Sequence, residues 1–291
     1  MPRTIEEGFV DFNENLKLLK SESEAIKKHR ASIHSCLKNK FGMNRFFKTG
    51  SVGNGTNVNG FSDTDYFAGI PTENLKENSA STLTAIKEAL QETFPSTKNI
   101  RVDSPAVVVP FGTVASEITE IIPADFLKTE DGVNIYDIPD GDGKWMNASP
   151  KAHNEYVSKV DKKHGNKVKP LIRFIKAWKY YQNVPISSFY LEMRIAKYAD
   201  QESIILYSTD VYYIFKNLLD GELSSMIDPV GVSGYIEACA SQAKKDDAIS
   251  KLKTALTRAE KARAAEEKGE IKESFEWWNL LYNEKFPSYY R

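Results

Sequence analysis

The sequence predicts an α+β protein, with a mixed sheet and flanking helices in its first half and a helical second half. Residues 100–112 and 117–126 are rich in Val, Ile and Thr, a composition typical of strands. Residues 81–94 carry apolar side chains at helical spacing, and beyond residue 150 helical periodicity dominates. Helices mixed with strands, followed by helices alone, indicate two lobes of different construction.

Length and composition limit the class of protein. The chain has 291 residues, of which 41% are hydrophobic and 27% charged, as in a compact globular protein of one or two lobes. Its formal net charge is -1, so the chain as a whole has no attraction for a polyanion. Any nucleotide site must therefore be local, and we expect no stable nucleic-acid partner.

The cysteine content and the lack of long apolar segments indicate the cellular compartment of the protein. Cys36 and Cys239 are the only cysteines, too few for a disulfide framework or a zinc site. The first residues lack the apolar run of a secretory signal, and no stretch of about 18 apolar residues is present. We therefore expect a cytoplasmic protein without a membrane partner.

The first lobe opens with a helix and a glycine-rich stretch. Residues 21–39 carry the capping box Ser21-x-x-Glu24 and then apolar residues at helical spacing. Between residues 45 and 60 four glycines punctuate a polar segment, and the alternation over residues 62–70 predicts a strand. A glycine-rich turn thus leads into a strand.

Residues 131–150 are dense in Gly, Pro, Asp and Asn, which favours turns and marks a change in organisation. We place the lobe boundary there, which divides the chain into residues 1–150 and 151–291. In the second lobe, periodicity predicts helices over residues 168–181 and 244–268, the latter stopped by Gly269, and a further helix containing Phe275, Trp277, Trp278 and Leu281.

Asp63 and Asp65 lie two positions apart in the expected strand, so their side chains point to the same face. Crowded carboxylates repel each other unless a cation lies between them, and hard oxygen ligands suit Mg²⁺. Two such ions about 3.5–4 Å apart can serve both the attacking and the leaving oxygen in phosphoryl transfer. Because Asp pairs are also common in exposed loops, this feature alone leaves both interpretations open.

Gly50 and Ser51 precede this pair in the glycine-rich stretch. Backbone N–H groups left accessible by glycine, together with a Ser hydroxyl, can hold a triphosphate beside a metal ion. The alternative interpretation of these two residues is an ordinary turn.

The ordered combination of Gly50-Ser51, Gly55-Thr56 and Ser62-Asp63-x-Asp65-Tyr66-Phe67 resembles the polymerase-β-like nucleotidyltransferase superfamily. Within it, the chain is most similar to the bacterial cGAS/DncV-like nucleotidyltransferases, the CD-NTases of antiphage defence. Residues 136–154 and 269–287 extend the likeness over nearly the whole chain. The resemblance implies a catalytic nucleotidyltransferase core in residues 1–150 and a helical lobe that completes a nucleotide-binding cleft between the two.

The superfamily has a third carboxylate on a neighbouring strand, before an apolar-apolar-Pro-Ala run. Glu120, followed by Ile-Ile-Pro-Ala, matches this pattern, although most relatives have Asp there. Asp125 is the alternative, but the two positions differ by five residues and so face opposite sides of a continuous strand. The resemblance thus implies Asp63, Asp65 and Glu120 as metal ligands and catalytic residues.

In residues 168–181, the apolar side chains recur at helical spacing and form one face of the expected helix. Lys169, Arg173 and Lys176 form a basic stripe, which we expect on the opposite face. Such a stripe is by default a solvated surface. The resemblance instead implies that Lys176, in Arg-Phe-Ile-Lys-Ala-Trp, binds the donor triphosphate. It also implies Ser188 on phosphate and Phe189 stacked on the base, with a core position as the alternative for this ring.

The resemblance further implies the activity. Donor ribonucleoside triphosphates, ATP and GTP among them, bind between Gly50-Ser51 and Lys176 with two Mg²⁺ ions, which Mn²⁺ can replace. A ribose hydroxyl attacks the α-phosphate, pyrophosphate leaves, and repetition closes a cyclic di- or oligonucleotide, cyclic GMP-AMP being one such product. A separate effector protein receives this second messenger.

Two other functions stay open. Nucleotides could be transferred to RNA ends or to a protein, although RNA tailing favours an extended basic surface that the neutral charge does not suggest. A nucleotide-binding regulator without catalysis is the third hypothesis, and retention of both Asp63 and Asp65 counts against it.

Overall fold

The computed structural model describes residues 3–17, 20–61, 64–111 and 117–290. The chain divides into two compact units. The sheet unit comprises Leu18–Glu155, and the helical unit combines Met1–Lys17 with Tyr156–Arg291. The unit boundary thus falls inside helix α5 (Pro150–Lys163), a few residues beyond the expected boundary at residue 150.

A seven-stranded mixed sheet forms the centre of the sheet unit. Its main path runs β1-β2-β5-β4-β3, while β6 pairs with β5 and with β7. Only the pairing of β2 with β5 is parallel among the pairings that the described residues make. The strands are β1 (Arg45–Thr49), β2 (Thr64–Gly69), β3 (Arg101–Asp103), β4 (Ala106–Phe111), β5 (Glu117–Glu130), β6 (Val133–Pro139) and β7 (Trp145–Ala148).

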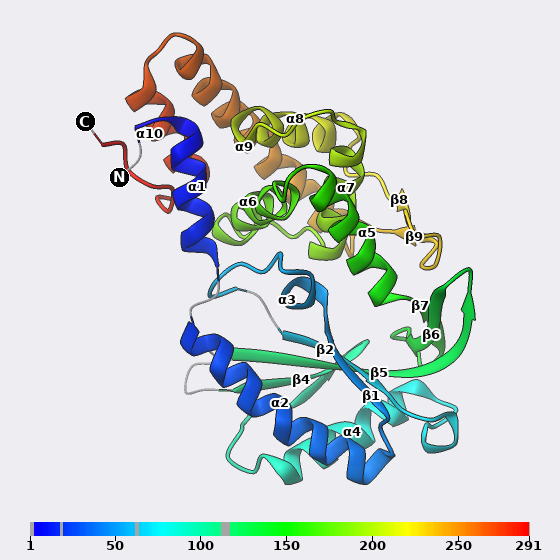
Figure 1. Ribbon diagram of the computed structural model, residues 1–291. Coiled ribbons are helices and arrows are strands. Elements are labelled where there is room, and N and C mark those ends of the chain that lie inside the picture. Colours follow the sequence, from blue (N-terminus) through cyan, green and yellow to red (C-terminus); the bar gives the residue numbers. More distant parts are fainter. Residues whose placement is uncertain (1–2, 18–19, 62–63, 112–116, 291) are drawn as a thin grey trace. The chain divides into compact units, whose positions relative to one another are not determined.

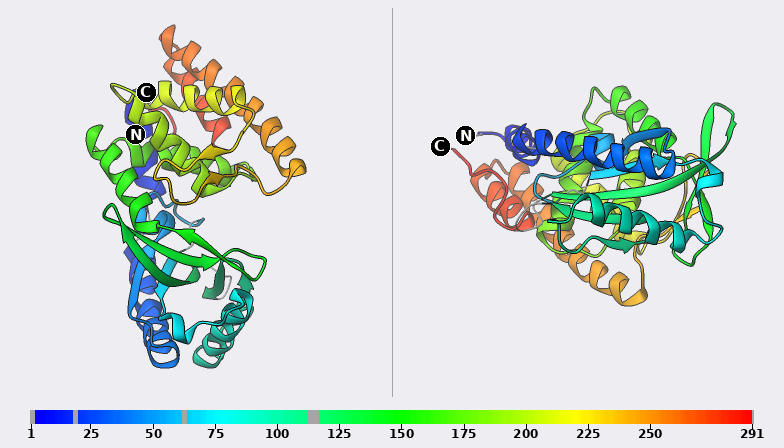
Figure 2. Two further views of the ribbon diagram at one scale, coloured as in Figure 1. Left: turned by 90° about the vertical axis from the view of Figure 1, so that its right-hand side faces the viewer. Right: turned by 90° about the horizontal axis from the view of Figure 1, so that it is seen from below.

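Helices α2 (Lys20–Phe41) and α4 (Ser79–Thr93) lie across one face of this sheet (Figures 1 and 2). Burial of apolar side chains explains the packing, since residues of both helices share one core cluster with strand residues that include Ala68, Val107 and Ile121. On the opposite face, Phe67 and Ala124 belong to a smaller cluster with Tyr136 and Ile138 of β6. Helices therefore cover one face of the sheet and a smaller cluster lies on the other. Side chains of a strand alternate between the two faces, so the residues on the same face as Phe67 point away from α2 and α4.

The helical unit contains α1 (Ile5–Leu16) and the helices of the second half, α6 (Val168–Tyr181), α7 (Ser188–Gln201), α8 (Tyr207–Asp220), α9 (Gln242–Glu267) and α10 (Ile271–Leu281) (Figure 1). It also holds a two-stranded hairpin of β8 (Met226–Ile227) and β9 (Tyr235–Ile236). The expected helices over residues 168–181 and 244–268 correspond to α6 and α9, and α10 begins two residues after Gly269.

The first helix belongs to the helical unit, although the sequence suggested that residues 1–150 form one lobe. Helix α1 begins with a capping box in which Thr4 and Glu7 bond each other's backbone N–H groups. Its fully buried Phe9 and Phe12 lie about 5–6 Å, ring centre to ring centre, from Phe174. Burial of these aromatic rings ties the first residues to helices more than 150 positions away.

Two smaller features complete the fold. Helix α2 begins at Lys20 and ends at Phe41, so Ser21 lies inside the helix and not at its N-cap. Over the described part of the chain, none of the helices combines the length and apolar character that crossing a membrane requires.

Candidate functional site

Gly50 lies where strand β1 passes into α3, a five-residue helix (Gly50–Asn54). Its φ of +56° is a conformation that glycine adopts without strain. A Cβ atom at this position would lie 1.7 Å from Oδ2 of Asp65, far inside van der Waals contact. Glycine is therefore required here on two grounds, and it allows the backbone to lie directly against the Asp65 carboxylate.

Asp65 and Glu120 are register partners on the neighbouring parallel strands β2 and β5. Paired residues of adjacent strands point to the same face, about 5 Å apart at their backbones. Both are half-buried, and both share parity with Phe67 and so point away from α2 and α4. The fold thus brings these two of the expected site residues side by side.

The third expected ligand, Asp63, lies outside the described residues, and so does its neighbour Ser62, which the resemblance implies as a nucleotide-binding residue. Among the residues that are described, no group of three His, Cys, Asp or Glu side chains could hold a metal ion. Two neighbouring carboxylates are nevertheless oxygen donors of the kind that Mg²⁺ prefers. Asp65 and Glu120 therefore fit a divalent metal as part of its ligand set.

Asp125 lies further along the same strand. Its register partner is Asp137 on β6, and Thr72 donates a hydrogen bond to its Oδ1 at 2.9 Å. Burial and the charge of Asp125 raise the pKa of Asp137. Asp125 is thus engaged at the β6 side of the sheet, five residues from Glu120, and the register with Asp65 favours Glu120 as the partner carboxylate.

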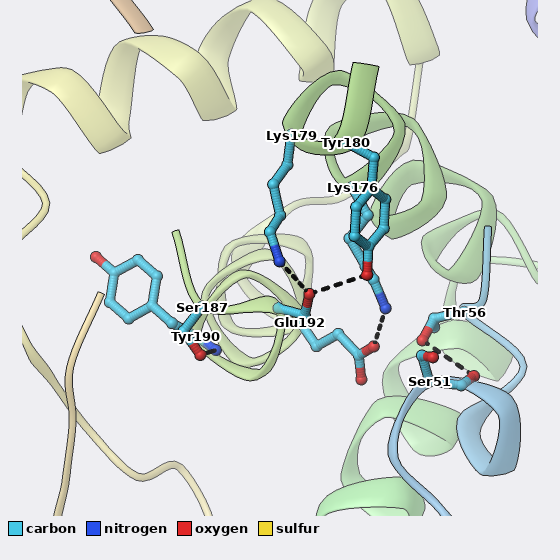
Figure 3. A network of polar contacts seen from close by, with 9 residues as sticks. Ser51, Thr56, Lys176, Lys179, Tyr180, Ser187, Tyr190 and Glu192 are labelled. Carbon is cyan, nitrogen blue, oxygen red and sulfur yellow. Dashed lines mark hydrogen bonds and ion pairs between the residues drawn. The ribbon is translucent and has the colours of Figure 1, made fainter. Parts of the chain in front are cut away.

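The loop after α3 is closed by backbone hydrogen bonds. Gly55 adopts a left-handed conformation that ends α3, and the N–H of Thr56 donates to the Ser51 carbonyl at 2.8 Å. The Thr56 hydroxyl also donates to that carbonyl, at 3.5 Å (Figure 3). Thr56 is fully buried, whereas Ser51 is half-buried. The segment is therefore a short helix that ends in a glycine cap.

Lys176 is fully buried in the structure, and its Nζ donates to Oε1 of Glu192 at 2.6 Å (Figure 3). Glu192 lies on α7 and is 5% exposed. A buried ammonium group needs a counter-ion, so this pairing holds Lys176 in place. The carboxylate was not among the residues that the sequence singled out.

The expected solvated stripe on α6 is wrong. Arg173 donates to Asn13 at 2.7 Å, and burial lowers the pKa of its guanidinium. Lys169 donates to Ser158 at 3.1 Å. Helix α6 contacts α1, α7 and α8, so its polar side is covered by neighbouring helices as well as its apolar side.

Ser188 and Phe189 form the first turn of α7, whose N-cap is Ser187. Phe189 is 38% exposed while the adjacent Tyr190 is 1% exposed, so the Phe189 ring is not a core residue. Ser188 contacts two side chains from the last turn of α6. Lys179 Nζ lies 2.5 Å from the Ser188 Oγ, and the Tyr180 hydroxyl lies 3.2 Å from it.

The model of the SMODS family, a Second Messenger Oligonucleotide or Dinucleotide Synthetase domain, matches residues 4–161. A probable cyclic nucleotide synthase of Bacillus cereus (strain VD146) is 27% identical over 178 residues, which cover 59% of this chain and 52% of the relative. The chain thus spans about half the length of that curated relative.

Two solved structures have the same fold. CdnC of E. coli MS115-1, solved with ATP, aligns with a TM-score of 0.75 at 18% identity, covering 97% of this chain and 98% of CdnC. The cyclic AMP-GMP synthase DncV of Vibrio cholerae, solved with the linear intermediate 5' pppA(3',5')pG, aligns with a TM-score of 0.79 at 14% identity. That alignment covers 99% of this chain and 97% of DncV.

Proposed function

Because the chain belongs to the Second Messenger Oligonucleotide or Dinucleotide Synthetase family, we propose that it is a template-independent nucleotidyltransferase that makes a cyclic nucleotide. Ribonucleoside triphosphates are its substrates. Each bond forms when a ribose hydroxyl attacks the α-phosphate of a donor, and pyrophosphate leaves. A final bond between the ends of the linear product closes the ring.

The observation that carries this proposal is the pairing of Asp65 with Glu120 across parallel strands, next to the backbone of Gly50. Together with Asp63, these carboxylates would hold two Mg²⁺ ions, for which Mn²⁺ can substitute. When bound, such ions activate the attacking hydroxyl and neutralise charge on the leaving pyrophosphate. The strand register supports the assignment because it sets two oxygen donors side by side on one face.

Each unit contributes residues that we propose as contacts of the nucleotide. We assign its triphosphate to Gly50, Ser51 and Ser62 in the sheet unit, and to Lys176 and Ser188 in the helical unit. Phe189 stacks on the base, and its exposed ring supports this role over a core position. Such stacking contributes about 1–3 kcal/mol and tolerates any base. To bind phosphate, the Lys176 ammonium has to exchange part of its contact with Glu192 for the anion.

The proposed bases, product and biological role are taken from the similar proteins. ATP and GTP are the proposed substrates and a cyclic GMP-AMP type of molecule the product, in line with the cyclic AMP-GMP synthase that shares the fold. The product acts as a second messenger in antiphage defence, where an effector protein receives it. The chain works in the cytoplasm without a membrane partner.

The test is incubation of the pure protein with four labelled ribonucleoside triphosphates and Mg²⁺ or Mn²⁺, followed by phosphatase treatment. We expect a small product that resists phosphatase, because a closed ring has no terminal phosphate. Absence of such a product with either metal contradicts the proposal.

The same assay separates the two other functions. Label that enters RNA or protein only when these are added indicates transfer to an external acceptor. Nucleotide binding without any transfer indicates a regulator. Neither alternative is favoured by a feature of the described residues over cyclic nucleotide synthesis.

A further inference from the structure

A cavity of about 230 Å³ lies inside the helical unit, between α7 and the second half of α8. The residues that line it from α7 recur at helical spacing, namely Tyr190, Arg194, Lys197, Tyr198 and Gln201. At about 100° per residue, Ser188 and Glu192 lie on the opposite side of α7. The cavity is therefore separate from Ser188 and from the ion pair of Lys176 with Glu192.

Apolar side chains form much of the cavity wall. Ile195 on α7 is fully buried, and Ile214 and Leu218 on α8 are 3% and 5% exposed. Tyr198 adds its ring, which is fixed because its hydroxyl donates to Oδ1 of Asp210 at 2.6 Å. A cavity of about 150 Å³ is large enough to hold benzene. This cavity thus has room for an apolar ring or a short chain together with a polar head group.

Arg194 is held at the cavity by hydrogen bonds to neutral acceptors. Its Nε donates to the Tyr190 hydroxyl at 3.0 Å, and its Nη2 donates to the carbonyls of Ser224 and Ser225 at 2.9 Å and 3.4 Å. Over the described part of the chain, Nη1 has no hydrogen-bond partner and no carboxylate pairs with the guanidinium. Nη1 therefore has donors to offer, and bonds from a guanidinium to an ionised oxygen are stronger than those between neutral groups.

Lys197 adds a second positive charge, three positions after Arg194 on the same face of α7. Among the residues that the structure describes, its ammonium has no hydrogen-bond or ion-pair partner, and none of those that line the cavity is acidic. Like charges on neighbouring positions of a helix repel each other, and an anion beside both would relieve that repulsion. The cavity thus combines apolar walls with two cations for which the described residues supply no counter-ion.

We propose that this cavity binds a small organic anion, namely a carboxylate on an apolar aromatic or aliphatic body. Arg194 supplies a fixed cation, Lys197 supplies a second one from the rim, and the body packs against the apolar wall. The inference does not depend on the proposed function, because none of these side chains is assigned to the nucleotide. The alternative is that Arg194 only fastens the segment around Ser224 to α7.

The test measures the binding of benzoate and of hexanoate to the full chain by calorimetry, in a buffer without other carboxylates. Benzamide and hexanamide are the neutral counterparts of the two anions. We expect both anions to bind saturably and both amides to bind more weakly, because the amides lack the charge-assisted hydrogen bonds. Arg194→Met should weaken binding of the anions by about tenfold or more, and Lys197→Met, which removes an exposed charge, by about threefold.

Lys253→Met is the matched control, because Lys253 is an exposed lysine on α9 that does not line the cavity. It should leave the affinity unchanged, and thermal unfolding of each variant checks that the fold is retained. Since Arg194 also bonds Ser224, Lys197→Met decides the matter if Arg194→Met does not fold. The proposal is overturned if neither anion binds saturably, if the amides bind as tightly as the anions, if a folded Lys197→Met binds the anions as tightly as wild type, or if Lys253→Met weakens binding equally.

Discussion

The two units build their candidate groups in different ways. In the sheet unit, the backbone places the acidic residues, since strand register sets Asp65 beside Glu120 and the absence of a Cβ at Gly50 leaves room for the carboxylate. In the helical unit, side chains place one another, as Glu192 does for Lys176 and Ser188 for Lys179. Substitutions should therefore impair chemistry in the sheet unit and stability or nucleotide affinity in the helical unit.

The largest effect is expected from Glu120→Ala. Loss of one carboxylate from a metal-holding pair should reduce turnover by about 10³-fold, equivalent to about 4 kcal/mol of transition-state stabilisation. Asp125→Ala is the control, because that carboxylate accepts a hydrogen bond from Thr72 and lies five residues further along the strand. Pyrophosphate release measures both, with circular dichroism as a check of folding. If only Asp125→Ala abolishes turnover, the assignment of Glu120 is wrong.

The helical unit should respond to Glu192→Ala through stability. This change leaves the buried Lys176 ammonium without its carboxylate and should lower the free energy of unfolding by about 3 kcal/mol. Chemical denaturation measures the effect. Lys176→Met combined with Glu192→Leu should cost less than the single change, because no charge remains buried.

An exposed ion pair provides the reference for that comparison. Lys216 and Asp220 are one helical turn apart on α8, and both side chains reach solvent, so Asp220→Ala should leave the stability close to that of wild type. If Glu192→Ala and Asp220→Ala lowered the free energy of unfolding equally, the ion pair with Glu192 would not be what holds Lys176 in place.

Gly50→Ala tests the role of the backbone in the sheet unit. The φ of +56° and the contact with Asp65 Oδ2 should together cost about 1–3 kcal/mol of strain and displace the carboxylate. Gly132→Ala is the control, since Gly132 has a φ of +80° but no atom within 4 Å of the added Cβ. Thermal unfolding and turnover should both fall in Gly50→Ala, whereas turnover should persist in Gly132→Ala. Full turnover in Gly50→Ala contradicts the close approach.

A smaller effect on stability than that of Gly50→Ala is expected from Asp137→Asn. Asp137 lies opposite Asp125, and like charges in this position should destabilise the folded state by about 0.2–1 kcal/mol at pH 7. Because the pKa of Asp137 is raised on folding, its penalty is present above that pKa and is lost as the pH falls through it. The variant should therefore be more stable than wild type at pH 7, with a smaller advantage near pH ~4.

Denaturant unfolding at the two pH values measures this difference, with Asp142→Asn as the control for removal of an exposed charge. A variant that is less stable than wild type at pH 7 would show that Asp137 makes a favourable interaction that outweighs the repulsion.

Local patterns predicted much of the fold. The fold class and the resemblance to the CD-NTases are confirmed, and the apolar period over residues 168–181 matches α6 to the residue. Periodicity shows which side of a helix is apolar, but not how many neighbours cover the polar side. For this reason the sequence placed Lys176 on a basic stripe and missed both its burial and its partner Glu192.

The sequence also did not predict contacts between segments that are distant along the chain. The aromatic residues of α1 find their partners on α6 and α10, far along the chain, and no local pattern specifies such partners. The contact of Lys179 with Ser188 was not expected either, because it depends on how α6 and α7 pack.

Mass spectrometry of the product made by the pure protein tests the central claim most directly. Incubation with ATP, GTP and Mg²⁺ should yield a species composed only of nucleoside monophosphate units joined in a ring, without a 5′-triphosphate, and Glu120→Ala should not form it. Linear products alone, or no product with either Mg²⁺ or Mn²⁺, would contradict the account.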